Sequence, residues 1–213
     1  WYTIALRFAL RTANLLNDHR FDEFLTGRLE SISAAFEGAF WKDTYYSSGI
    51  LVDDRANALS VLAGLCPEEH FYHIRRVLLG VFNATAFMEN YVLFALCEMG
   101  YVKDAYERMA SRYYGLAYNE NTTLWETFFI LGTKNHAWSG APATLAFRYF
   151  MGIDTIDGFK TFSLNPCYEL FERMSCRFYA KDGPVSILAD AEDGIRITNA
   201  SSSVCLSQMG CND

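Results

Sequence analysis

The stretch "FMENYVLFALCEMGYVKDAYERM", residues 87–109, determines the predicted fold. Its first half, from Tyr91 to Leu96, is apolar almost all round, which predicts a helix buried on every side. Its second half, after Gly100, places apolar residues at the spacing of a one-sided helix, namely Val102, Ala105, Tyr106, Met109, Ala110 and Tyr113. A buried helix joined by a short turn to a half-exposed helix predicts a helical hairpin.

A second pair of the same kind precedes this one. The segment "DDRANALSVLAGL" (53–65) stops at Cys66, and Pro67 then starts "PEEHFYHIRRVLLG" (67–80). Proline at the first helical position followed by two acids is a typical helix start. Buried and half-exposed helices in alternation predict two concentric layers, as in a toroid of helical hairpins, the (α/α) barrel.

The periodicity changes after Gly152. The segments "GFKTFSL" and "FERMSCRFYA" show partial alternation, "KDG" (181–183) predicts a tight turn, and "PVSIL" and "GIRIT" follow. These features predict antiparallel strands that form part of a small β-sandwich. We therefore expect a mainly α protein, with a partial barrel over residues 1–153 and a β-sandwich segment over residues 154–213.

Composition excludes several classes of function. The 213 residues carry a net charge of −7, and the pI is about 5.1, which argues against binding to a phosphate backbone, so no nucleic-acid partner is expected. No apolar run reaches the roughly 18 residues of a membrane span. The six cysteines include no CxxC pair, and a core of this size needs no disulfide framework. Because the sequence begins at Trp1, inside a predicted helix, we expect it to belong to a longer protein.

The predicted buried helices carry polar residues at their N-terminal ends. Asp53 and Asp54 open the first and Glu89 the second, while His136 and Trp138 precede "APATLAFRYFMG" (141–152). If these N-termini converge, they form a polar funnel with aromatic walls. Asp53 and Asp54 also have a simpler explanation, as an N-cap and a first-turn acid.

The helix that starts at Pro67 carries two histidines three residues apart, His70 and His73. Such a pair can bind zinc, but no third ligand is evident. We interpret this side of the helix as a solvated face, and we predict no metal and no cofactor.

Four stretches carry a resemblance to a known family. They are "DDRANALSVLAGL", "FALCEMGYVKDAYERM" leading to "NTTLWETF" (121–128), "TKNHAWSGAPATLAFRYFMGI" (133–153) and "GFKTFSLNPC" (158–167). With them, the chain resembles the C-terminal half of the catalytic barrel of glycoside hydrolase family 78, the bacterial α-L-rhamnosidases, together with the start of the C-terminal β-sandwich. The resemblance implies an (α/α)6 barrel and a carbohydrate substrate.

The resemblance also implies a mechanism. Enzymes of this family invert the anomeric centre with two acids, a general acid and a general base. The resemblance places the general base at Glu126, the glutamate of the Trp-Glu motif, and it places His136 in the sugar pocket. By position, Trp125 and Trp138 line the same pocket, and Asp53 and Asp54 are further candidate sugar contacts.

One part of the family pattern is missing. The acidic motif that supplies the general acid does not occur in this sequence, and Glu89 is the only local candidate for this role. We therefore expect the isolated chain to be inactive, and to need an N-terminal half of the barrel or a second copy as its partner. The family implies a periplasmic or extracellular location. 

Two other functions fit the sequence. One is an (α/α)-barrel glycosidase with a different sugar specificity. The other is a non-catalytic carbohydrate-binding module, in which Glu126 is a structural acid.

Overall fold

The computed structural model of the chain describes residues 1–121, 123–129, 131–155, 159, 161–180 and 183–198. The chain divides into two compact units, Trp1–Ser139 and Gly140–Asp213. The first unit is helical, and the second contains all the described strands. Each unit is described separately below.

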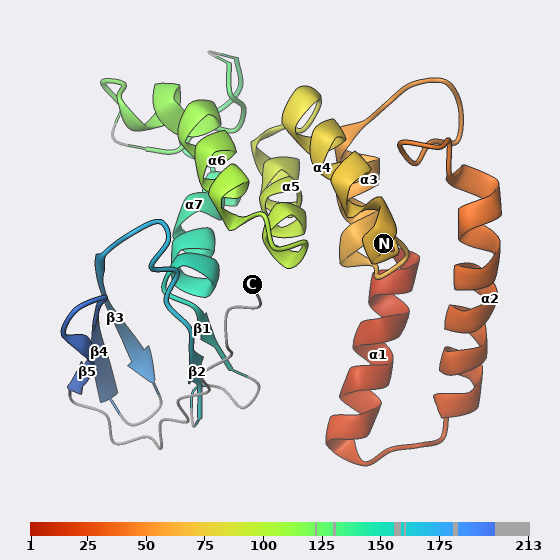
Figure 1. The fold of residues 1–213 in the computed structure, drawn as a ribbon, viewed down its shortest axis with the longest axis horizontal. Coiled ribbons are helices and arrows are strands. Elements are labelled where there is room, and N and C mark those ends of the chain that lie inside the picture. The colour runs from red at the N-terminus through yellow and green to blue at the C-terminus, as the bar shows by residue number, and fades with distance from the viewer. Residues whose placement is uncertain (122, 130, 156–158, 160, 181–182, 199–213) are drawn as a thin grey trace. The chain divides into compact units, whose positions relative to one another are not determined.

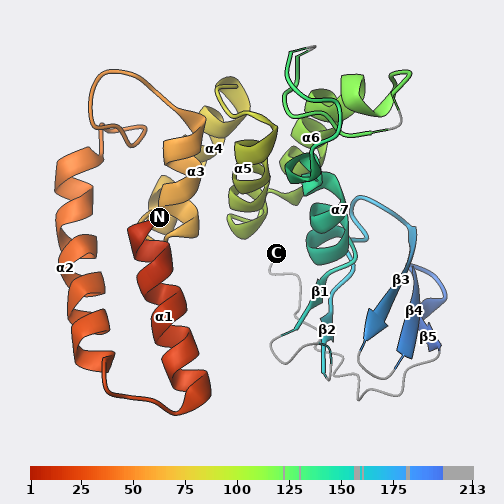
Figure 2. The ribbon, with the colours of Figure 1, turned by 180° about the vertical axis from the view of Figure 1, so that it is seen from behind.

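The first unit begins with a long antiparallel hairpin. Helices α1 (Tyr2–Leu16) and α2 (Asp22–Phe40) lie side by side in both views (Figures 1 and 2). The remaining elements of the unit are α3 (Asp54–Leu62), the short 3-10 helix η1 (Glu68–His70), α4 (Phe71–Gly80), α5 (Ala86–Glu98), α6 (Val102–Ala117) and η2 (Ala137–Ser139).

Local sequence explains where these helices begin and end. The Asp53 side chain accepts a hydrogen bond from the backbone N–H of Arg55 and caps α3, which confirms the N-cap interpretation. Helix α5 stops at Gly100, which has a φ of +87°, and the backbone N–H of Tyr101 donates to the carbonyl of Leu96. Glycine reaches this left-handed conformation without steric strain.

The burial of the helices follows the predicted alternation. Helices α3 and α5 pack against each other, and α5 buries consecutive residues such as Val92, Leu93, Leu96 and Cys97. Helix α4 buries one side, centred on Ile74 and Leu78. The predicted stripe of α6 was wrong in part: its buried residues are Ala105, Arg108, Tyr113 and Leu116, whereas Ala110 is exposed.

The second unit opens with a helical segment, α7 (Ala141–Leu145) continued by η3 (Ala146–Phe150). Strands β1 (Ile153–Asp154) and β2 (Ser163–Leu164) form one antiparallel pair. Strands β3 (Arg173–Ala180), β4 (Gly183–Asp190) and β5 (Gly194–Thr198) form a three-stranded antiparallel sheet in the order β3-β4-β5. Of the predicted turn, Lys181 and Asp182 lie outside the described residues.

A shared apolar core joins the two sheets of the second unit. Strand β4 turns Val185, Ile187 and Ala189 inward at every second position, as a half-buried strand requires. These side chains cluster with buried residues next to and within β1 and β2, namely Met151, Ile153, Phe162 and Leu164. Packing of two sheets across one core agrees with the predicted sandwich segment.

Gly152 is required where the helical segment meets β1. Its φ is +69°, and a Cβ atom there would overlap the backbone carbonyl of Asn165. The backbone N–H of Asn165 also donates to the carbonyl of Gly152 at 3.0 Å. The close approach of the two backbones therefore excludes a side chain at this position.

The observed architecture confirms the predicted fold class of a mainly α chain followed by an antiparallel β segment. The compact units divide before α7, whereas the predicted domain limit lies after η3, because this helical segment packs against the strands that follow it. No helix among the described residues is long and apolar enough to cross a membrane.

Candidate functional site

A loop between α6 and α7 carries four of the six predicted site residues, namely Trp125, Glu126, His136 and Trp138. Two backbone hydrogen bonds close it: the N–H of Glu126 donates to the carbonyl of Thr133 at 2.9 Å, and the N–H of His136 donates to the carbonyl of Leu124 at 2.8 Å. The Thr123 hydroxyl adds a bond to the carbonyl of Lys134. These bonds bring Glu126 and His136 to the same end of the loop.

The Glu126 carboxylate is oriented by hydrogen bonds from Thr133. Its Oε2 accepts hydrogen bonds from the backbone N–H of Thr133 at 2.9 Å and from the Thr133 hydroxyl at 3.2 Å. These bonds, and to a lesser degree the charge of nearby His136, lower the pKa of Glu126. The Glu126 side chain is 31% exposed, so an ionised carboxylate is held in place and remains accessible.

Gly132 allows this arrangement. Its φ is +92°, and a Cβ atom there would lie 2.9 Å from Oε2 of Glu126. Glycine therefore serves both the turn and the approach of the carboxylate to the Thr133 backbone.

His136 and Trp138 form an aromatic surface beside the carboxylate. Their rings stack with centroids 3.8 Å apart, and Nδ1 of His136 lies 4.0 Å from Oε2 of Glu126. The indole N–H of Trp138 donates to the backbone carbonyl of Glu126 at 3.1 Å. Trp138 is 41% exposed, and its ring lies 5.5 Å from that of Phe87 on α5. The structure thus brings Glu126, His136 and Trp138 together.

Trp125 has a different environment. The ammonium group of Lys134 lies 3.5 Å from the centroid of its indole ring, at cation–π distance. Its Nε1 is buried and has no hydrogen-bond partner among the residues that the structure describes. One face of the Trp125 ring is therefore already covered, while the Trp138 ring stays exposed.

Asp53 and Asp54, although adjacent, occupy different surroundings. Asp53 pairs with the guanidinium of Arg55, which lowers the pKa of its carboxyl group, and it lines a pocket of about 440 Å³ together with residues 46–51 and Ala56. Asp54 is fully buried. Of the two, Asp53 is the one that faces a cavity.

Asp54 belongs to a buried network of charges. Nη2 of Arg108 lies 2.8 Å from Oδ2 of Asp54 and 2.9 Å from Oε2 of Glu89, and its Nε lies 2.5 Å from Oε1 of Glu89. Asp54 and Glu89 are fully buried and Arg108 is 4% exposed. The acids at the starts of α3 and α5 therefore lie close together, as predicted. They bind the Arg108 guanidinium, however, and do not line a cavity. Glu89 is thus a structural acid in this chain.

Arg112 connects this network to the Glu126 loop. Its Nε lies 3.4 Å from Oε2 of Glu89, and its guanidinium lies 4.1 Å from the ring centroid of Phe128. Tyr113 packs edge-on against the same ring at 5.1 Å. Phe128, which follows Glu126 by two residues, therefore anchors the loop on α6.

The prediction of a solvated face at His70 was wrong. The His70 side chain is 16% exposed, and its ring stacks on Trp41 with centroids 3.6 Å apart. The Tyr46 hydroxyl lies 3.1 Å from Nδ1 of His70 and donates to Glu37 at 2.8 Å. His70 binds the loop after α2 to the start of α4. No group of three or more metal-ligating side chains occurs in the described part of the chain.

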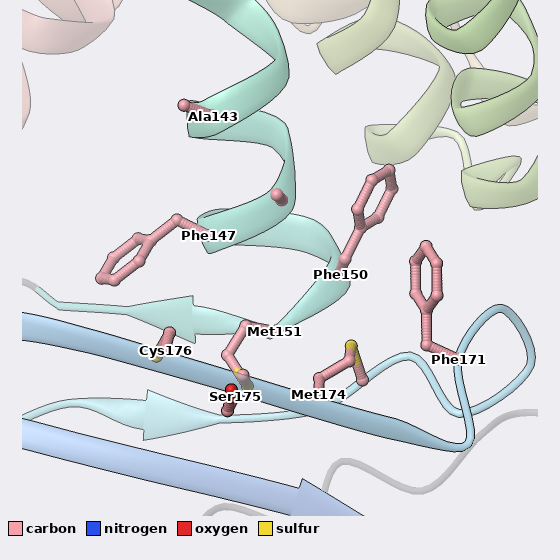
Figure 3. A pocket seen from close by; sticks show the side chains of 9 residues that line it. Ala143, Phe147, Phe150, Met151, Phe171, Met174, Ser175 and Cys176 are labelled. Atoms are coloured by element: carbon pink, nitrogen blue, oxygen red, sulfur yellow. The ribbon is translucent and has the colours of Figure 1, made fainter.

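The second unit contains an apolar pocket of about 380 Å³ (Figure 3). The side chains in Figure 3 come from α7, η3 and the chain around β3, and they are mostly aromatic, methionine and alanine. Its ionisable group is the Cys176 thiol, whose pKa is raised by burial. This pocket lacks the carboxylates and imidazole needed for acid–base chemistry.

Helical hairpins followed by a small antiparallel β part form a fold that solved glycoside hydrolase structures share. The GH78 family rhamnosidase of Bacillus sp. GL1 superimposes with a TM-score of 0.82 at 16% identity, over 97% of this chain and 25% of that chain. The α-L-rhamnosidase from Dictyoglumus thermophilum gives 0.74 at 21% identity, over 90% of this chain and 24% of that chain. The chain thus spans about a quarter of either structure.

These similarities establish the fold and confirm the predicted resemblance at that level. Neither a comparison with models of known families nor a search of curated proteins found a match. The sequence did not identify Thr133 and Gly132 as residues that position the Glu126 carboxylate. A glycine within the polar run "GTKNH" is a signal for a backbone turn, but it does not reveal which side chain the turn supports.

Proposed function

We propose that this chain carries the general-base side of the active site of an inverting glycoside hydrolase that removes terminal α-L-rhamnose. The observation that carries the proposal is the Glu126 carboxylate. It is oriented by Thr133, partly exposed beside His136 and Trp138, and belongs to a chain with the fold of two rhamnosidases.

In the proposed reaction, Glu126 acts on a water molecule. The ionised carboxylate accepts a proton from the water as the water oxygen attacks the anomeric carbon, and the bond from that carbon to the glycosidic oxygen breaks. The leaving oxygen takes its proton from a general acid on the opposite face of the sugar. We propose that this acid, and the rest of the barrel, lie outside these 213 residues.

The surrounding side chains bind the sugar in this proposal. His136 hydrogen-bonds a hydroxyl group, and the exposed Trp138 ring packs against the C–H face and the methyl group. Asp53 contacts the substrate from its pocket. Trp125 packs against Lys134, and Asp54 pairs with Arg108. In this proposal these two residues support the side chains that contact the sugar.

The test uses the longest natural polypeptide that contains this sequence. Hydrolysis of an aryl α-L-rhamnoside is compared between the wild type and Glu126→Gln, with rhamnose binding measured in both. We expect the variant to lose at least about 100-fold in kcat, the contribution of a positioned acid–base group, and to keep its affinity for rhamnose. A variant with an unchanged rate would contradict the assignment of the base. Turnover of other aryl glycosides in preference to the rhamnoside would contradict the proposed specificity.

A further inference from the structure

One hydroxyl group connects the proposed base to the proposed sugar-binding imidazole. Oγ1 of Thr133 lies 3.2 Å from Oε2 of Glu126 and 2.8 Å from Nδ1 of His136. The backbone N–H of Thr133 reaches the same carboxylate oxygen at 2.9 Å. Glu126 and His136 therefore both contact the one hydroxyl group of Thr133.

The chemistry of these groups determines which atom donates in each bond. An ionised carboxylate is an acceptor and cannot donate, and a glutamate carboxyl, whose ordinary pKa is about 4.3, is ionised at neutral pH. The Thr133 hydroxyl must then donate to Glu126, because otherwise two oxygen lone pairs would face each other at 3.2 Å. Its oxygen is left to accept from His136, which requires a proton on Nδ1.

We propose that Thr133 is a positioning residue of this site, whose hydroxyl holds neutral His136 in the Nδ1–H tautomer and leaves Nε2 as a hydrogen-bond acceptor for a substrate hydroxyl. The reference to a substrate rests on the function proposed above. The assignment of the tautomer rests on the hydrogen bonds alone, since the partner of one ring nitrogen determines the state of the other.

The surroundings restrict His136 to this arrangement. Stacking on Trp138 fixes the plane of the imidazole ring. The hydrogen bond from the His136 backbone N–H to the Leu124 carbonyl fixes the backbone from which the side chain extends. The Glu126 carboxylate faces His136, with Oε2 at 4.0 Å from Nδ1. In water, free histidine prefers the opposite tautomer with the proton on Nε2, so the proposed state is one that the protein imposes.

Nitrogen NMR of the imidazole rings tests the proposal without substrate. The chain is labelled with ¹⁵N-histidine, and the His136 signals are assigned among the 4 histidines by comparison with His136→Asn. At a pH where the rings are neutral, we expect Nδ1 of His136 to resonate as a protonated nitrogen and Nε2 as a non-protonated one. Thr133→Val removes the hydroxyl and is expected to shift the population toward Nε2–H.

Thr133→Ser is the matched control, because it keeps a hydroxyl and should keep the wild-type pattern. Circular dichroism of each variant verifies that the helices are intact. A wild type with the proton on Nε2, or a Thr133→Val spectrum identical to the wild type, would overturn the proposal. Since these signals are recorded without turnover, they are independent of the hydrolysis assay that tests the function.

Discussion

Replacing Arg108 by methionine is expected to destabilise the helical unit strongly. The substitution leaves the fully buried carboxylate of Asp54 without its cation, and it leaves buried Glu89 with the longer contact of 3.4 Å to Arg112. It also removes the donor to the carbonyls of Leu78 and Val81. Removing one partner of a buried ion pair lowers the free energy of unfolding by roughly 3–5 kcal/mol. Methionine preserves much of the apolar stem, so the loss reports mainly on the charges.

Thermal unfolding followed by circular dichroism measures this effect. For a chain of this size, 1 kcal/mol corresponds to about 2–4 °C, so Arg108→Met should lower the Tm by about 6–20 °C. Arg75→Met is the matched control. Arg75 pairs with Asp104 between α4 and α6, but its side chain is 34% exposed. Such a pair contributes at most about 1 kcal/mol, and we expect a shift below about 4 °C.

A combined variant separates the charge from the packing. When Asp54→Asn and Glu89→Gln are added to Arg108→Met, neutral amides replace the uncompensated charges, and part of the lost Tm should return. Equal shifts for Arg108→Met and Arg75→Met would refute the reasoning about buried charge. The reasoning would also be refuted if the Tm loss of the combined variant equalled the sum of the losses in the three single variants.

Three further predictions concern other parts of the chain. In the active natural polypeptide, Thr133→Val should raise the pKa of Glu126, because a hydrogen bond to the charged form of the carboxylate is lost. The acid-side inflection of kcat/KM should then move to higher pH. Thr133→Ser, which keeps the hydroxyl, should leave this inflection in place. Gly152→Ala should lower the unfolding free energy by more than about 2 kcal/mol, whereas Gly115→Ala, in the last turn of α6 with open space around it, should raise it by up to about 0.5 kcal/mol, both measured by urea unfolding. Burial and a neighbouring carboxylate raise the pKa of Tyr46, so stability should decline above about pH 10, and should decline less in Tyr46→Phe.

Much of the fold follows from local signals in the sequence. Asp53 predicts the start of α3, Gly100 predicts the end of α5, and the alternation over residues 184–188 predicts the inward face of β4. These signals act over a few residues. They depend on hydrogen bonds and side-chain directions that the chain makes with itself locally.

The buried polar residues could not be predicted in this way. Arg108 lies in a helix whose apolar residues define a different stripe, and a charged side chain is ordinarily assigned to solvent. It is buried because acids from α3 and α5 reach it, and these are 54 and 19 positions away. His70 was misassigned for the same reason, since its partner Trp41 lies 29 positions away, in the loop after α2.

The candidate site shows the same division. The resemblance indicated Glu126 and His136 as neighbours, and the structure places them together. Thr133, which joins them, carries no recognisable motif of its own. Its role depends on the backbone turn at Gly132, which brings the Thr133 hydroxyl to the carboxylate.

The Arg108 network also has a consequence for how the hairpins unfold. In arrays of helical repeats, each repeat usually contacts only its immediate neighbours. The stability of the array is then close to the sum of the stabilities of the repeats and of the interfaces between neighbours. Here one guanidinium from α6 neutralises acids at the start of both α3 and α5. Detaching α6 would leave two buried charges without this guanidinium, Glu89 on α5 and Asp54 in the preceding hairpin. The helices from α3 to α6 should therefore exchange their amide protons in a single cooperative event, with no gradient of fraying along the array.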